Sequence, residues 1–124
     1  MSEQELINQM KWASQNGDID QVNEILSKGL DVNKDLGMGR TALHFAADTG
    51  QTDVIEVLLS KGANINGKDR HGITPLLNAI WDNHPESVKF LLSKGANPKD
   101  KTPDGQTYLE AAENDQLREV LKAC

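Results

Sequence analysis

The chain has 124 residues, which suits one domain or one short array of repeats. Its net charge of −6 argues against a nucleic-acid partner, because phosphates require a basic surface, and it favours a basic protein as partner. No apolar run approaches the roughly 20 residues that span a bilayer.

The start of the chain and its cysteine content bear on the compartment. The first residues are acidic and lack the apolar stretch of a secretory signal. Cys124 is the only cysteine, so no disulfide can form within the chain. These features predict a cytoplasmic protein, and a chain this small can also enter the nucleus.

The first helix is expected to begin after Ser2, because Ser2 and Glu5 have the Ser-x-x-Glu spacing of a capping box. We expect this helix to run through Asn16-Gly17. Three later helices are expected to begin at threonines that can act as N-caps: Thr41, Thr74 and Thr107. Gly50 and Asn83 then suit the left-handed C-caps that would end the helices beginning at the first two of these threonines.

A second helix is expected in each of the first three units, because apolar residues recur at i, i+3 and i+4. The predicted buried stripes are Val22, Ile25 and Leu26; Ile55, Leu58 and Leu59; and Val88, Leu91 and Leu92. A lysine and a glycine end each of these helices, at Lys28-Gly29, Lys61-Gly62 and Lys94-Gly95. Extended finger loops should follow.

The segment Leu-Ser-Lys-Gly occurs three times, with its glycines 33 residues apart. This period predicts an all-α fold, a solenoid of four stacked helix-turn-helix repeats with extended finger loops. The chain would form a single domain with repeats at about 2–34, 35–67, 68–100 and 101–124. The outer repeats should act as caps, and Leu117 arrives four residues early on the 33-residue register, which indicates that one helical turn is missing from the last repeat.

Two segments resemble the ankyrin signature Gly-x-Thr-Pro-Leu-His-x-Ala-Ala. They are Gly-Arg-Thr-Ala-Leu-His-Phe-Ala-Ala at Gly39–Ala47 and Gly-Ile-Thr-Pro-Leu-Leu-Asn-Ala at Gly72–Ala79. The resemblance covers nearly the whole chain and implies an ankyrin-repeat solenoid. The sequence departs from the signature at Ala42, where proline is usual.

The chain is also similar to a group of small, four-repeat cytosolic ankyrin proteins, through segments such as Trp12-Ala13, Asp31-Val32-Asn33 and Pro103-Asp104-Gly105. This resemblance implies that the partner is the alpha/beta heterodimeric actin capping protein. The chain would cover the basic surface with which capping protein binds the filament barbed end, and so promote growth there. An association with Rel-type transcription-factor dimers is also attributed to the family and stays open as the alternative.

The expected binding site lies on the concave face made by the fingers and the first helices. Its candidate residues form three aligned pairs on the 33-residue register: Trp12 with Phe45, Asp48 with Trp81, and Thr49 with Asp82. Aromatic anchors among carboxylates suit a partner segment in which Lys and Arg alternate with apolar residues. The alternative is that Trp12 and Trp81 only pack against adjoining helices, and for Phe45 both interpretations are equally open.

Catalysis and metal binding are not indicated. The three histidines, His44, His71 and His84, hold different positions in successive repeats and should not surround one point. Cys124 has no neighbouring His or Asp to activate it. We therefore expect a monomeric binding protein that is not an enzyme and needs no metal or cofactor.

Overall fold

A computed structural model describes residues 1–124 and contains eight α-helices, with one isolated β-bridge between Lys101 and Thr107. The helices follow one another as four pairs. Their bounds are α1 (Glu3–Asn16) and α2 (Ile19–Ser27), α3 (Ala42–Asp48) and α4 (Thr52–Ser60), α5 (Pro75–Trp81) and α6 (Pro85–Ser93), and α7 (Tyr108–Ala111) and α8 (Asp115–Lys122). None of them combines the length and the apolar character that crossing a bilayer requires.

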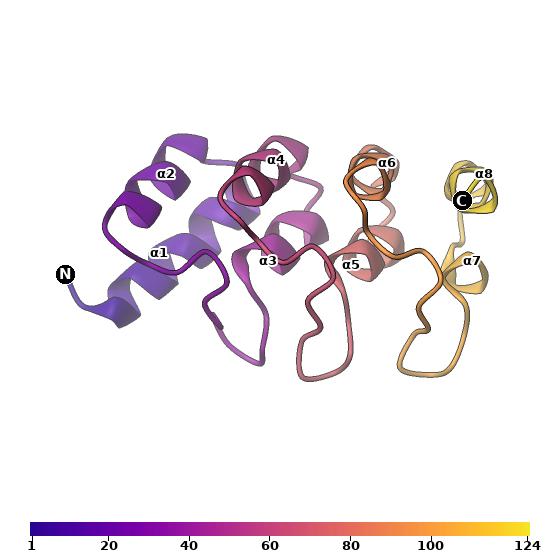
Figure 1. The fold of residues 1–124 in the computed structure, drawn as a ribbon, viewed down its shortest axis with the longest axis horizontal. Coiled ribbons are helices and arrows are strands. Elements are labelled where there is room, and N and C mark those ends of the chain that lie inside the picture. The colour runs from indigo at the N-terminus through magenta and orange to yellow at the C-terminus, as the bar shows by residue number, and fades with distance from the viewer.

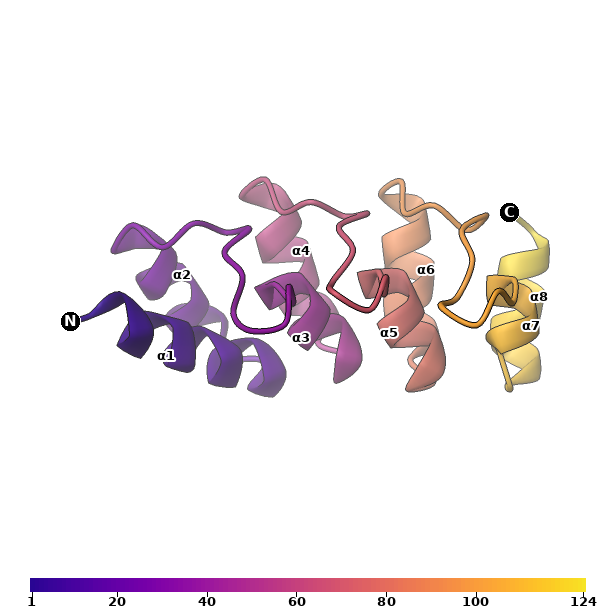
Figure 2. The same ribbon diagram turned by 90° about the horizontal axis from the view of Figure 1, so that it is seen from below.

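The pairs stack side by side in two layers (Figure 1). We call α1, α3, α5 and α7 the front layer, because they lie next to the long finger loops, and α2, α4, α6 and α8 the back layer. Each helix contacts its pair partner and the neighbouring helices of its own layer. Figure 2 shows the finger loops after α2, α4 and α6 along the same edge of the stack. This arrangement confirms the expected all-α solenoid with extended fingers.

Local hydrogen bonds fix the helix ends at residues that the sequence indicated. The backbone N–H of Glu5 donates to Ser2 Oγ at 3.1 Å, and that of Leu77 donates to Thr74 Oγ1 at 3.2 Å. Asn83 follows α5 with φ at 59°, the left-handed conformation expected of it. These bonds satisfy backbone groups that a helix terminus leaves without partners.

Asparagine side chains hold neighbouring finger loops together. Asn33 Oδ1 accepts a hydrogen bond from the N–H of Asn64 at 2.8 Å. The same bond recurs one repeat later, where Asn66 Oδ1 accepts from the N–H of Asn97 at 2.9 Å. Each finger is therefore positioned by the next one, as in other stacks in which a repeat contacts only its neighbours.

One core of 28 buried apolar residues runs through the stack. The back layer contributes residues that are each at most 1% exposed: Ile25, Leu58 and Leu91. The sequence analysis placed Leu26, Leu59 and Leu92 in the same buried stripe, but the structure leaves them half-buried. Each lies one residue further along its helix, about 100° around the axis, and so sits at the edge of the stripe.

The last pair is shorter than the others. α7 has four residues, whereas α3 and α5 have seven each. The helical turn that the sequence analysis found to be absent from the last repeat is therefore absent from α7. Leu109 holds the register position of Leu43 and Leu76, which are each 1% exposed, yet it is 37% exposed because no further helix of this chain packs beyond it. Tyr108 is fully buried, and its hydroxyl lies 2.8 Å from Thr74 Oγ1.

Candidate functional site

Two tryptophans stand out on the front layer because they are large, apolar and exposed. Trp12 lies on α1 and is 54% exposed, and Trp81 is the last residue of α5 and is 44% exposed. Each side chain therefore leaves about half of its surface open to solvent. Exposed tryptophans are the side chains that most often anchor a protein partner when binding removes them from water.

Phe45 lies between them in the front layer, but it is only 9% exposed. The guanidinium of Arg40 covers its ring, 4.5 Å from the centroid. Arg40 also lies 3.7 Å from the carboxylate of Asp48, as measured from Nη2 to Oδ2. The sequence analysis did not single out Arg40, although it alone of the four residues at its register position carries a charge. Phe45 thus supports Arg40 and presents little surface of its own.

Asp48 and Asp82 form a pair of carboxyl groups where α3 and α5 end. The pKa of Asp82 is raised to about 6, first because protonated Asp82 can donate a hydrogen bond to the carboxylate of Asp48, and burial and the negative charge of Asp48 act in the same direction. The charges of His84 and Arg40 oppose this rise only in part. A lysine or arginine from a partner would relieve the repulsion, so this pair favours a cationic ligand.

Thr49, the remaining predicted site residue, is exposed and joins two helices of the front layer. Its hydroxyl donates to the backbone oxygen of Gln15 at 2.9 Å and lies 3.3 Å from that of Phe45. The structure thus places Thr49 beside Asp48, but its hydroxyl is already used within the chain.

The three histidines are far from a common centre. His44 Nε2 lies 2.8 Å from the carbonyl oxygen of Ile73 in the next finger, and His84 Nε2 lies 2.9 Å from the carbonyl oxygen of Asp48. Burial lowers the pKa of His44, which is consistent with a neutral ring. His71 is exposed on a finger loop, and no group of three or more His, Cys, Asp or Glu side chains in the chain is arranged to hold a metal ion.

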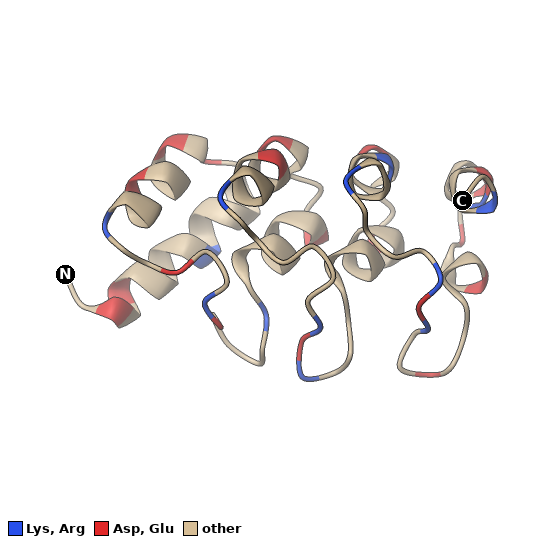
Figure 3. Ribbon diagram, in the orientation of Figure 1, with Lys and Arg blue, Asp and Glu red and all other residues tan.

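The charges are more mixed than the net charge suggests. Figure 3 shows both signs along the finger loops. Ion pairs join neighbouring fingers there, with Lys68 Nζ 3.2 Å from Asp100 and Arg70 Nη2 4.0 Å from Asp35. In the front layer, the Asp48–Asp82 pair brings two carboxyl groups together, and Asp82 is next in sequence to the exposed Trp81.

Comparisons with known proteins agree with this architecture. Residues 10–102 match the family model for ankyrin repeats in three copies. Myotrophin from Homo sapiens, Gallus gallus and Xenopus laevis is 51% identical to this chain over 35 residues. The matched stretch is 28% of this chain and spans 30% of the length of each of these curated relatives.

Proposed function

This chain belongs to the ankyrin-repeat family, and from that premise we propose that it sequesters the heterodimeric actin capping protein and so promotes growth at filament barbed ends. Ankyrin repeats form a protein-binding fold, so the general function is recognition of a protein partner. The choice of partner follows the resemblance seen in the sequence, and the identity with myotrophin over 35 residues is in keeping with it.

The observation that carries the proposal is the exposure of Trp12 and Trp81 on the front layer, together with the Asp48–Asp82 carboxyl pair, in which Asp82 is next in sequence to Trp81. The tryptophans would provide apolar contact area, and the carboxyl pair would select a basic surface. Their arrangement fits a partner segment in which cationic side chains alternate with apolar ones. Such a segment belongs to a protein surface rather than to nucleic acid or lipid.

Binding alone would produce the effect. A protein that covers the basic surface of capping protein prevents it from reaching the barbed end, and no bond needs to be made or broken. The chain would then act as a monomer, one copy per heterodimer, without a cofactor, and it would act in the cytoplasm. Regulation of a Rel-type transcription-factor dimer through the same surface is the alternative, and it would require entry into the nucleus.

The direct test is a barbed-end elongation assay in the presence of capping protein. Wild-type protein should restore elongation with one-to-one stoichiometry. The Trp12→Ala variant should need a roughly thirtyfold higher concentration, which corresponds to a loss of about 2 kcal/mol.

A matched control is Leu109→Ala, which removes an exposed apolar side chain outside the proposed site. It should act like the wild-type protein, and the melting temperature should show that each variant is folded. Failure of a large excess of folded wild-type protein to relieve capping would reject the proposal. Pull-down of a transcription-factor dimer by the same wild-type protein would then favour the alternative.

A further inference from the structure

The ends of the front-layer helices are tied to the following pair by side-chain donors. The backbone oxygen of Gln15, near the end of α1, accepts from Gln51 Nε2 at 3.1 Å. At the next junction, the backbone oxygen of Asp48, the last residue of α3, lies 2.9 Å from His84 Nε2. Gln15 and Asp48 are 33 residues apart, as are Gln51 and His84, so these are the same bond in successive repeats.

Trp81 holds the corresponding position at the last junction, but its backbone oxygen has no donor. The residue four positions later is Pro85, which has no N–H, and the N–H of His84 donates to Ala79. Because a turn is missing from α7, the N-cap position that Gln51 holds before α4 and His84 holds before α6 falls on Asn114 before α8. Asn114, which precedes α8, uses its side-chain oxygen to accept from Gln116 and Leu117.

The last junction also differs from the first two in the residue that lies beneath the bridging side chain. A Cβ at Gly17 would lie 2.5 Å from Gln51 Oε1, and a Cβ at Gly50 would lie 2.6 Å from His84 Nδ1. The bridging side chains therefore lie directly over glycines. Asn83 is on the same register, and it carries a side chain although its φ is 59°. With no bridging side chain above it, that position has room for one.

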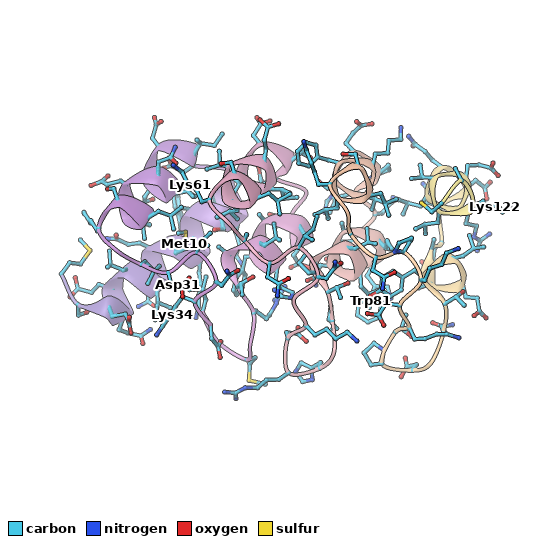
Figure 4. All side chains as sticks on the ribbon, in the orientation of Figure 1. Met10, Asp31, Lys34, Lys61, Trp81 and Lys122 are labelled. Atoms are coloured by element: carbon cyan, nitrogen blue, oxygen red, sulfur yellow. The ribbon has the colours of Figure 1, made fainter.

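A cavity of about 210 Å³ occupies this place, and we call it the notch. Ile80 and Leu117 form part of its apolar wall, and Trp81, labelled in Figure 4, lines it too. Glu113 and Asn83 supply polar groups at the notch, and Glu113 is exposed. The notch thus combines the Trp81 ring with the Glu113 carboxylate. The backbone oxygen of Trp81 accepts no hydrogen bond from within the chain.

We propose that the notch binds an arginine side chain of the protein partner, an inference that rests on the proposed function for the existence of that partner. The guanidinium takes the place that Gln51 and His84 occupy at the inner junctions, and donates to the Trp81 oxygen. Its planar fork carries several N–H donors, so it can reach Glu113 as well. Tryptophan is the aromatic side chain that best attracts a cation, and the arginine stem suits the apolar wall.

The chain does not supply this cation itself. Arg118 is the nearest arginine in sequence to Glu113 and Asn114, but its Nε donates to the backbone oxygen of Ala112 at 2.8 Å, and its Nη1 lies 3.9 Å from Asp115. No lysine or arginine lines the notch. Glu113 is therefore available to a cation from outside.

The experiment titrates the protein with N-acetyl-arginine amide at constant ionic strength and follows backbone and indole N–H signals by NMR. Saturating shifts should appear at Asn83, Glu113, Asn114 and the Trp81 indole, with a dissociation constant on the order of millimolar. N-acetyl-citrulline amide, which has nearly the same shape but no charge, should produce much smaller shifts. Shifts spread over all acidic residues, or equal shifts with both compounds, would overturn the proposal.

Two variants sharpen the result. Glu113→Gln should weaken arginine binding about fivefold, the effect of one exposed ion pair, whereas Glu56→Gln on α4 should leave it unchanged. Asn114→Gln places in the chain the residue type found at Gln51, so it should fill the notch and suppress the shifts. Unchanged arginine binding in both notch variants would contradict the assignment. Because no protein partner is present, this test can succeed even if binding to capping protein fails.

Discussion

The junction between the second and third helix pairs differs from the junction between the third and fourth, although all four pairs follow the same repeating sequence pattern. At the inner junction, His44 and His84 each reach a backbone oxygen of the neighbouring repeat, and Leu43 and Leu76 are buried. At the last junction, the Tyr108 hydroxyl meets Thr74 instead, and the Trp81 oxygen is left without a donor. The inner junction thus satisfies its polar groups within the chain, whereas the last one leaves the backbone oxygen that the proposed arginine site uses.

The largest expected difference between the junctions is in stability. Leu76→Ala should lower the free energy of unfolding by about 2–5 kcal/mol, because it opens a cavity in the core. Leu109→Ala, at the same register position, should lower it by less than about 1 kcal/mol, because Leu109 is partly exposed. Urea unfolding followed by circular dichroism measures both, and equal losses would mean that the last pair is packed like the inner ones.

The aromatic residues of the front layer should separate binding from stability. Trp81→Ala should weaken capping-protein binding by about 2 kcal/mol, roughly thirtyfold, and leave the melting temperature nearly unchanged. Phe45→Ala should instead destabilise the fold, because its ring is buried beneath Arg40. Calorimetric titration together with thermal unfolding tests both variants. A strongly unstable Trp81→Ala protein would show that this side chain is structural.

Removing a side-chain hydrogen bond that crosses a junction should lower the free energy of unfolding more at the inner junction than at the last one. His44→Leu leaves the Ile73 oxygen without its partner, and a loss of about 1–3 kcal/mol is expected at pH 7.5. Tyr108→Phe removes one hydroxyl whose partner, Thr74 Oγ1, keeps its bond from the Leu77 N–H, so about 1 kcal/mol is expected. Hydrogen exchange at the second finger loop, which contains Ile73, should rise in the first variant only.

The pH dependence should be the smallest effect, because two groups oppose each other between pH 7 and pH 5. The pKa of His44 is lower in the folded than in the unfolded protein, so protonation favours unfolding as the pH falls below 6.5. The pKa of Asp82 is raised to about 6, so its protonation stabilises the fold as the pH falls through that value. Since Asp82 is exposed, its contribution should stay below about 1 kcal/mol and weaken with salt.

Single variants separate the two contributions. In Asp82→Asn, stability should fall from pH 7 to pH 5, because only the His44 contribution is left of the two. In His44→Leu, stability should rise over the same range. Unfolding curves at several pH values decide between these slopes, and the same slope in both variants would show that neither group is responsible.

The sequence by itself determined the repeat, the helices and their ends. Periodic residues such as Gly29, Gly62 and Gly95, and caps such as Ser2 and Thr74, act through local backbone geometry, which is the same wherever the segment occurs. Register also aligned Trp12 with Phe45 on one face of the front-layer helices, but it did not predict which of them is exposed, because Trp12 is 54% and Phe45 only 9% exposed. Nearest-neighbour packing makes such a stack unusually predictable.

Only the tertiary structure decided what meets across a junction. It placed Arg40 over Phe45, joined the carboxyl groups of Asp48 and Asp82, and left the Trp81 oxygen without a donor. These outcomes depend on side-chain directions in two repeats at once, and on the shortening of α7 that leaves Leu109 exposed. Register shows which residues align, but it does not show which of their atoms touch, because that depends on the separation and tilt of the packed helices.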